Sequence, residues 1–276
     1  MVNLKINNIP VSVPEGTTIL EAARSVGIRI PTFCYLKEIN AIGACRICVV
    51  EVKGARSMVA ACVYPVAEGM EVTTNSEAVI KARKTTLELI LSDHQKKCLS
   101  CIRSTNCELQ NLANEYGCDA TAFEGATNEF QPDTSTDWLI RDNNKCILCR
   151  RCVAACAKTQ GVFAIGMQNR GFKSEIGSEF GKSLGEVACI NCGQCIAACP
   201  TGALTEKDAT KEVWAALNDP KKFVVFQPAP AVRVAIGEEF GMPIGTNVEG
   251  KMVAALRRLG FDKVFDTDFG ADMTIM

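Results

Sequence analysis

Eight cysteines in the middle of the chain repeat one motif, Cys-x2-Cys-x2-Cys-x3-Cys. The first copy is Cys146, Cys149, Cys152 and Cys156, and the second is Cys189, Cys192, Cys195 and Cys199. Four thiolates are the usual ligands of a 4Fe-4S cluster, and a Cys-x2-Cys-x2-Cys loop can supply three of them. Zinc ribbons and disulfides are the alternatives, but zinc ribbons lack the third and fourth cysteines at these spacings. The motifs therefore predict two 4Fe-4S clusters.

The repeated motif resembles that of bacterial-type ferredoxins. Pro200 after the last cysteine fits this resemblance, whereas Cys156 is followed by Ala157. In the two-cluster ferredoxin arrangement, the fourth cysteine of each motif binds the other cluster. The resemblance therefore implies one cluster on Cys146, Cys149, Cys152 and Cys199, and a second on Cys189, Cys192, Cys195 and Cys156.

A separate group of four cysteines lies nearer the N-terminus, with the spacing Cys34-x10-Cys45-x2-Cys48-x13-Cys62. Gly43 and Ala44 are small and let backbone N–H groups approach sulfur. Plant-type 2Fe-2S ferredoxins have a shorter first gap. The longer gap is similar to the variant in the large subunit of respiratory NADH dehydrogenase and in iron-only hydrogenases. Four buried cysteines without a ligand are the alternative, but packing does not need this spacing. We expect a 2Fe-2S cluster.

His94, the only histidine, precedes Cys98, Cys101 and Cys107 at short spacing. Imidazole replaces thiolate in some iron-sulfur proteins, whereas a zinc site with one histidine and three cysteines is the main alternative. Fifteen of the sixteen cysteines plus His94 supply sixteen ligands, enough for four clusters, which leaves Cys118 as a free thiol or packing residue. The pattern resembles the same two families, in which it holds a 4Fe-4S cluster.

Length and composition favour a multidomain metalloprotein. A chain of 276 residues is longer than a single ferredoxin domain. Its sixteen cysteines lie in tight groups, which favours metal binding over the disulfide bonds of a secreted protein. No secretory signal or membrane-spanning apolar run is present, so we expect a cytoplasmic protein. The net charge of −1, without a basic stripe, argues against nucleic-acid binding.

The elements predict an α+β fold of four modules. Residues 1–78 read as a β-grasp module, with strands 3–6, 9–13 and 49–52, a turn at Asn7-Asn8, and a short helix between a Thr18–Glu21 capping box and Gly27. Residues 79–136 read as a mainly helical module, with Ser76 capping its first helix. Residues 137–208 hold the two-cluster module, with strands 138–140 and 162–167 and a hairpin or loop at 171–185.

The last module, residues 209–276, contains no cysteine and follows a βα-like pattern. We predict a helix over 209–218 and strands over 223–226 and 264–268. A second helix over 246–259 is predicted from a Thr246–Glu249 capping box and Gly260 as its C-cap. The sequence QPAPAVRVAIGEEFG, from Gln227 to Gly241, together with residues 270–273, closely resembles the opening of the catalytic domain of iron-only hydrogenases.

The order of all four modules is similar to that of iron-only (FeFe) hydrogenase catalytic subunits. This resemblance implies an electron relay that serves the reversible conversion of two protons and two electrons into H2. No cysteine follows Cys199, so we expect the catalytic cluster only in a longer protein. The implied partners are a flavin subunit that oxidises NADH and a small iron-sulfur subunit, a soluble ferredoxin, or both, in a hetero-oligomer. Some members of the resembling family form electron-bifurcating complexes of this kind.

Two other functions compete with this interpretation. One is the relay arm of another oxidoreductase, such as an NAD-dependent formate dehydrogenase, and the other is an independent polyferredoxin. No glycine-rich dinucleotide fingerprint follows a strand, so NADH would have to bind a partner.

Overall fold

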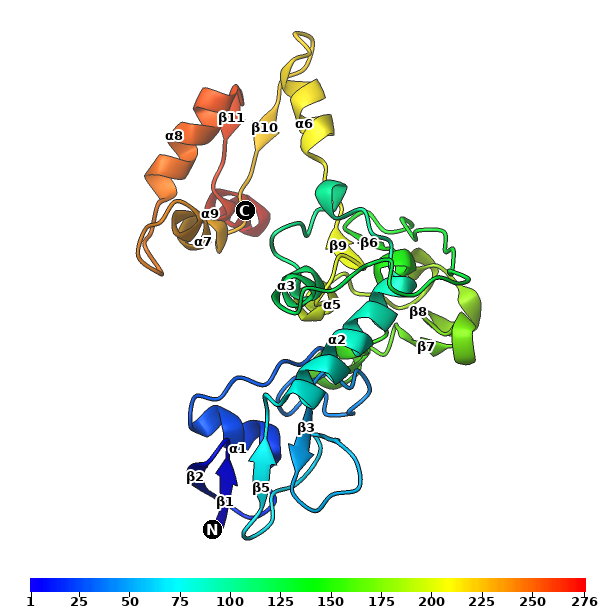
Figure 1. Cartoon of the computed structure of the whole chain (residues 1–276). Coiled ribbons are helices and arrows are strands. Elements are labelled where there is room, and N and C mark those ends of the chain that lie inside the picture. The colour runs from blue at the N-terminus through cyan, green and yellow to red at the C-terminus, as the bar shows by residue number, and fades with distance from the viewer. The chain divides into compact units, whose positions relative to one another are not determined.

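A computed structural model describes residues 1–276, which separate into two compact units, residues 1–207 and residues 208–276. Both units are mixed α/β (Figure 1). All the predicted ligands lie in the first unit.

The chain begins with a five-stranded mixed sheet. Its strands are β1 (Val2–Ile6), β2 (Ile9–Val13), β3 (Val49–Val52), β4 (Val59–Ala60) and β5 (Glu71–Thr73), in the order β2-β1-β5-β3-β4. Strand β1 pairs antiparallel with β2 and parallel with β5. Asn7 and Asn8 have φ of 48° and 65°, the left-handed values of a tight hairpin turn, so the predicted turn is confirmed.

Helix α1 (Ile19–Ser25) packs its apolar face on this sheet. Thr18 caps it by accepting the Glu21 N–H, whereas the Glu21 carboxylate binds Tyr35 and Arg24. Gly27 follows the helix in the left-handed region, as predicted. The apolar residues that alternate along β1 and β2 meet α1 in a core that includes Leu4, Ile6, Val11, Val13, Ile19, Leu20 and Val72.

Two helices follow the sheet. Helix α2 (Glu77–Ser92) begins where the Ser76 hydroxyl accepts the Val79 N–H, as predicted. A short 3-10 turn, η1 (Cys98–Ser100), leads to α3 (Glu108–Glu115). The buried Arg83 of α2 donates to the Val49 carbonyl and to the Tyr116 hydroxyl, which ties α2 to β3 and to the end of α3. No regular element lies between α3 and Leu139, so the predicted module is helical only in its first part.

Short elements dominate residues 139–206. Strand β6 (Leu139–Arg141) pairs with β9 (Leu204–Glu206), and β7 (Gly166–Gln168) pairs with β8 (Glu175–Gly177). The helices are α4 (Arg151–Ala154), a π-helical turn η3 (Ala155–Thr159) and α5 (Gln194–Ala198), and the 3-10 turns are η2 (Asn143–Lys145), η4 (Gly171–Lys173), η5 (Glu179–Gly181) and η6 (Leu184–Glu186). The predicted strand 162–167 is largely wrong, because Phe163 has φ of 58° and interrupts the extended backbone.

The second unit contains α6 (Thr210–Leu217), β10 (Val225–Phe226), α7 (Val232–Glu239), α8 (Glu249–Leu259), β11 (Lys263–Val264) and α9 (Thr267–Ile275). Strands β10 and β11 are parallel, which matches the predicted βα-like pattern. Gly260 ends α8 with φ of 109°, as predicted. Helix α7, within the Gln227–Gly241 stretch, was not predicted.

Two predictions for the second unit are wrong. The Thr246–Glu249 capping box does not form, because the Thr246 hydroxyl donates to the Pro243 carbonyl and Asn247 accepts the Glu249 N–H. Helix α8 therefore begins at Glu249, not at residue 246. The strand predicted over 264–268 ends at Val264, because the Asp266 side chain caps α9.

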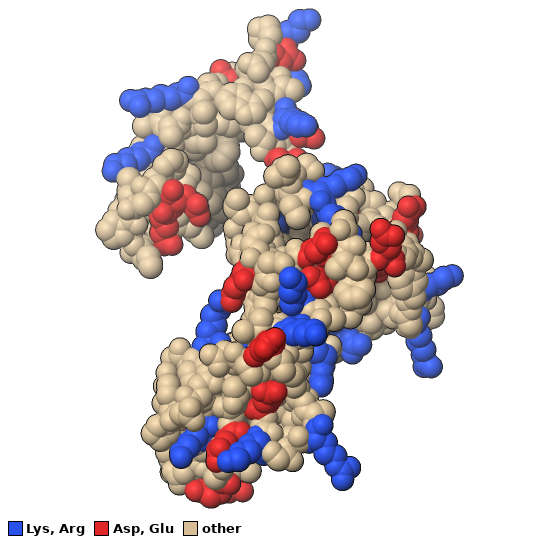
Figure 2. Space-filling view, viewed as in Figure 1, with Lys and Arg blue, Asp and Glu red and all other residues tan.

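The surface carries charges of both signs. On the face in Figure 2, lysine and arginine side chains are interspersed with acidic ones over the first unit. None of the helices combines the length and apolar character that crossing a membrane requires.

Candidate metal centres

The N-terminal cysteines gather in one buried group. Cys34, Cys48 and Cys62 are fully buried, and Cys45 is partly buried. The thiol of Cys34 is near enough to those of Cys45 and Cys62 for each to shift the pKa of the other, and the same holds for Cys62 and Cys48. The four thiols, separated by up to twenty-eight residues, therefore lie together in the interior of the first module.

Hydrogen bonding favours the anionic form of one thiol in this group. Hydrogen bonds from the thiols of Cys45 and Cys62, followed by the backbone N–H groups of Cys45 and Ala44, lower the pKa of Cys34. Gly43 has φ of 62°, which turns this loop, and a Cβ atom there would lie 3.1 Å from Val63 Cγ2. The small residues before Cys45 thus allow amide groups to point at sulfur.

The two repeated motifs fold into loops of the same backbone shape. The second residue after the first cysteine is left-handed in both copies, with φ of 54° at Leu148 and 53° at Asn191. The residue after the second cysteine is also left-handed in both, with φ of 60° at Arg150 and 74° at Gly193. Left-handed residues curl a loop so that successive N–H groups face one concavity. The Leu148 N–H accordingly points at the Cys146 sulfur, 3.4 Å away.

One cavity is lined by four cysteines from both motifs. Its walls include Cys146, Cys149, Cys152 and Cys199, together with the apolar side chains of Ile147, Ile176, Pro200, Ala203 and Leu204. Its cavity volume is about 20 Å³. This is room for about one water molecule, so the feature that marks the site is the convergence of four thiols and not its size.

A second cavity repeats this pattern with the remaining cysteines. Cys156, Cys189, Cys192 and Cys195 line it, together with Leu139, Val162, Ala164, Ile165, Ile190, Leu184 and Leu204. Its cavity volume is about 30 Å³. Leu204 of β9 lines both cavities, so they lie on either side of one side chain. In each cavity, three cysteines come from one motif and the fourth comes from the other.

The apolar walls make these thiols hard to ionise. Burial raises the pKa of Cys146 to about 11, that of Cys149 to about 12 and that of Cys195 to about 11. Burial also raises the pKa of Cys152 well above its ordinary value. At neutral pH these thiols carry protons, so a metal would have to displace protons in order to bind.

His94 lies just after α2 and is largely withdrawn from water. Burial, and then the positive charge of Lys145, lower its pKa to about 4. The imidazole is therefore neutral at pH 7, which is the form that binds metals. Its Nδ1 atom is buried and has no hydrogen-bond partner within the chain. Leaving a buried nitrogen without a partner costs free energy. The His94 Nδ1 atom is therefore suited to bind a group that is not part of the chain.

Two of the three cysteines that follow His94 pack against the end of the second motif. The Cys107 thiol lies 3.8 Å from the Pro200 carbonyl, and a Cβ atom at Gly202 would lie 2.9 Å from Cys101 Sγ. Burial raises the pKa of Cys107, with smaller contributions from Cys101 and Cys98 nearby. A larger residue at position 202 would therefore force the Cys101 side chain to move.

Sequence patterns did not reveal Gly202 or Lys145 as parts of this site. Lys145 forms an ion pair with Asp142 at 2.9 Å and faces His94, about fifty residues earlier in the chain. No local motif identifies such contacts, although a glycine two residues after Pro200 could have drawn attention. Cys118 packs at the edge of the core around Leu87 and Leu109, a core that also contains Cys34 and Cys149.

No three of the metal-binding side chains converge tightly enough to hold a single metal ion. The four thiols of each repeated-motif set instead line one small cavity, and the N-terminal thiols lie near one another in the core. The donor chemistry and the cavities therefore fit iron-sulfur clusters, in which ligands bind different irons.

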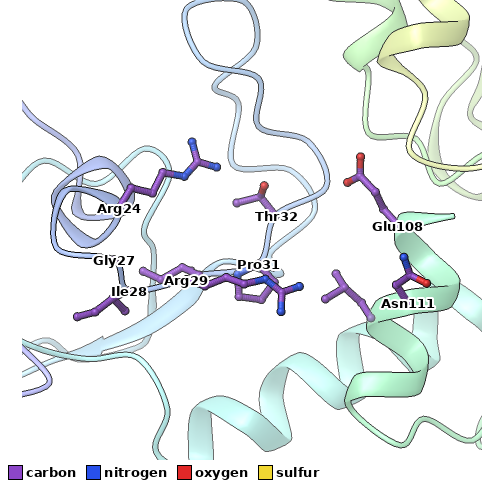
Figure 3. A pocket seen from close by; sticks show the side chains of 10 residues that line it. Arg24, Gly27, Ile28, Arg29, Pro31, Thr32, Glu108 and Asn111 are labelled. Carbon is purple, nitrogen blue, oxygen red and sulfur yellow. The ribbon is translucent and has the colours of Figure 1, made fainter. Parts of the chain in front are cut away.

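A larger groove, of about 460 Å³, contains none of these ligands. Figure 3 shows it between residues 27–32 and the start of α3. Its charged side chains already have partners: Arg29 pairs with Glu115 at 2.9 Å, Arg24 with Glu21 at 2.9 Å, and Glu108 with Arg151 at 2.6 Å. We assign no site to it.

Four family models match successive parts of the chain. They describe a 2Fe-2S iron-sulfur cluster binding domain (residues 1–77), an NADH-ubiquinone oxidoreductase-G iron-sulfur binding region (83–121), a 4Fe-4S dicluster domain (145–203), and the C-terminal domain of the iron-only hydrogenase large subunit (222–276). The chain therefore combines 2Fe-2S and 4Fe-4S binding domains.

Individual relatives match the same regions. The NADP-reducing hydrogenase subunit HndD of Solidesulfovibrio fructosivorans is 49% identical over 100% of this chain and 48% of its own length. Iron hydrogenase 1 of Clostridium pasteurianum is 42% identical over 100% of this chain and 48% of its own. A solved chain of an NAD+-reducing [NiFe]-hydrogenase is 32% identical, with a TM-score of 0.71 over 75% of this chain and 88% of its own.

The present chain spans about half the length of the two curated relatives. The iron-sulfur modules and the hydrogenase C-terminal segment occur together and in order, and both relatives align over the whole chain. The chain belongs to the iron-only hydrogenase family.

Proposed function

We propose that this chain is the electron-relay arm of an FeFe hydrogenase, binding one 2Fe-2S and three 4Fe-4S clusters. The observation that carries the proposal is the pair of cavities, each lined by four cysteines in the crossed combination of two-cluster ferredoxins. The proposed ligand sets are Cys34, Cys45, Cys48 and Cys62 for the 2Fe-2S cluster; His94, Cys98, Cys101 and Cys107; Cys146, Cys149, Cys152 and Cys199; and Cys189, Cys192, Cys195 and Cys156.

The proposed modules follow these sets. Residues 1–78 form a β-grasp 2Fe-2S module, residues 79–136 a histidine-ligated module, and residues 137–208 a two-cluster module. Residues 209–276 are the beginning of the hydrogenase domain. The match of residues 222–276 to that domain supports this proposal over a formate dehydrogenase arm or an independent polyferredoxin.

Bound clusters would supply one-electron oxidation and reduction without bound substrate. The residues of the chain hold the sulfur and nitrogen donors in place and exclude water. The buried thiols of the first module and the apolar walls of both cavities keep the surroundings dry. Left-handed loop residues direct N–H groups towards sulfur, which favours the anionic ligand over the thiol.

The whole protein would use these electrons for the reversible conversion of protons into H2. The catalytic cluster would be held outside this chain, which has no cysteine after Cys199. The names of the relatives, an NADP-reducing hydrogenase subunit and an NAD+-reducing hydrogenase, support a hetero-oligomer that exchanges electrons with nicotinamide through a flavin subunit. A small iron-sulfur subunit, a soluble ferredoxin, or both complete the proposed set of partners. Electron bifurcation is part of the proposal only if NADH and ferredoxin are both used.

Metal content tests the cluster assignment. We expect reconstituted protein to contain about fourteen irons per chain, two for one 2Fe-2S cluster and four for each of three 4Fe-4S clusters. Cys118→Ser is the matched control and should leave the iron content unchanged. About ten irons with zinc present would exclude a 4Fe-4S cluster from one site.

Hydrogen turnover tests the activity. The longer natural complex should evolve or consume H2 with ferredoxin, NADH, or both as electron carriers. Replacing Cys149 by serine should slow carrier-dependent turnover while leaving the fold of residues 1–77 intact. Unchanged turnover would remove this chain from the route of the electrons.

A further inference from the structure

One short segment of the N-terminal module reaches the first four-cysteine cavity. Residues 36–40 form a tight loop, in which the Leu36 and Asn40 backbones exchange hydrogen bonds. The side chain of Asn40 is 5% exposed. Its Nδ2 atom donates to the Cys34 carbonyl at 2.7 Å and to the Cys149 carbonyl at 3.3 Å.

These two acceptors belong to different proposed ligand sets. Cys34 lies in the 2Fe-2S set, and Cys149 lies in the set that lines the first cavity. Both residues are part of one buried apolar cluster that also contains Phe33, Ile47 and Leu87. An amide nitrogen has two hydrogens, so Asn40 can satisfy both carbonyls at once.

Burial makes this contact specific. A carbonyl or amide that is left unpaired in apolar surroundings costs free energy. The three groups therefore hold one another, and any shift of either cysteine loop breaks a hydrogen bond inside the core. These hydrogen bonds hold the two cysteine loops at a fixed distance from each other. Between the Cys34 and Cys149 carbonyls, the connection runs through the Asn40 amide alone.

A second contact joins the same segments without involving a cysteine. Lys158 Nζ, in the η3 turn, donates to the Ile39 carbonyl at 2.8 Å on the surface. It offers a mechanical tie between the modules but no connection to a proposed ligand. This contact provides a matched control.

We infer that Asn40 is a positioning residue that joins the 2Fe-2S ligand Cys34 to the 4Fe-4S ligand Cys149 and carries the electron path between their sites. The inference rests on the proposed function. With both clusters bound, one electron would pass from the reduced 2Fe-2S site to the oxidised 4Fe-4S site, and Asn40 would hold Cys34 and Cys149 in place through its two hydrogen bonds. No covalent bond forms or breaks, and no proton is transferred. The electron is supplied by the protein's one-electron carrier, or by a photoreductant in the experiment.

The test uses the reconstituted full chain with Asn40→Leu, which keeps the side-chain size but removes both donors. Flash reduction followed by rapid freezing and EPR gives the rate of electron equilibration between the two sites, and redox titration gives their potentials. We expect equilibration at least several-fold slower than in the wild type, with unchanged potentials. The Lys158→Met control should equilibrate at the wild-type rate.

An unchanged rate in Asn40→Leu with both clusters present overturns the inference, and so does equal slowing in Lys158→Met. If Asn40→Leu fails to retain its clusters, Asn40→Ser takes its place. Its single hydroxyl can bond at most one carbonyl. We expect it to slow equilibration, and a wild-type rate would again overturn the inference.

Failure of the proposed function has a different signature. Cys34→Ser and Cys149→Ser should each alter one EPR signal of the wild-type chain. If neither does, the ligand assignment itself is wrong, regardless of the rates measured with the Asn40 variants.

Discussion

The N-terminal module and the two-cavity region differ in what forms their cores. Residues 1–77 have a core between a sheet and α1 that is mostly aliphatic, with Ile6, Ile19 and Leu20 fully buried, although Cys48 and Cys62 also belong to it. In residues 139–206 the strands are three residues long, and the proposed ligands Cys152 and Cys199 make up a larger share of a smaller buried cluster. Further cysteines, among them Cys146, Cys156, Cys189 and Cys195, pack around it.

This difference predicts how each region depends on metal. Because most side chains of the first core are aliphatic, we expect that module to stay folded without metal, although Cys48 and Cys62 belong to its core. Around the two cavities, side chains face space and so forgo packing contacts on that side. Filling the cavities would restore those contacts, and metal binding would then be coupled to folding. The following predictions proceed from the largest expected effect to the smallest.

Removal of iron should have the largest effect, and it should affect the two regions differently. We expect the apoprotein to lose most amide protection in residues 139–206, because its cavities lose their contents, while residues 2–73 remain protected. Hydrogen exchange measured by mass spectrometry on apo and reconstituted protein checks this. Equal loss of protection in both regions would contradict the distinction.

Cys156→Ala tests the crossed arrangement of the second region. The cavity that contains Cys189, Cys192 and Cys195 loses a ligand, although these residues are more than thirty positions away. We expect loss of about four irons from this site, with the EPR signal of the other retained. Cys118→Ala is the control and should retain full iron content. Loss of the signal from the Cys146 site, with the other intact, would refute the crossed assignment.

Leu20→Ala tests the apolar core of the first region. Leu20 is fully buried under the sheet, so its truncation should lower the free energy of unfolding of this module by about 2–5 kcal/mol. Denaturant unfolding of the reconstituted and iron-free chain should give a similar loss in both. Ile9→Ala, at a side chain 44% exposed, should change it by less than about 0.5 kcal/mol. A loss seen only with iron bound would mean that metal also organises this core.

His94→Cys should have the smallest structural effect, since it exchanges one ligand for another. We expect a cluster to be retained with a lower reduction potential, because thiolate donates more charge to iron than neutral imidazole does. EPR-monitored redox titration measures the shift. An unchanged spectrum and potential would remove His94 from the ligand set.

Local signals in the sequence predicted much of the fold. Asn7-Asn8, Ser76 and Gly260 act within a few residues of themselves, and the structure confirms the turn, the N-cap and the C-cap. The capping box predicted at Thr246 was wrong. The Thr246 hydroxyl donates to the Pro243 carbonyl, and Asn247 accepts the Glu249 N–H in its place. Strand 162–167 was wrong because Phe163 takes a left-handed conformation that apolar periodicity does not reveal.

The sequence by itself predicted which thiols group together, from cysteine spacing and from the resemblance to two-cluster ferredoxins, and the two four-cysteine cavities have this crossed combination. It also determined the family, through motifs read along the chain. Only the tertiary structure decided which atoms connect the groups. Asn40 meets Cys149 across 109 residues, and Gly202 meets Cys101 across a comparable gap. Such contacts depend on how separate modules pack, and side-chain packing at long range leaves no periodic or local trace in the sequence.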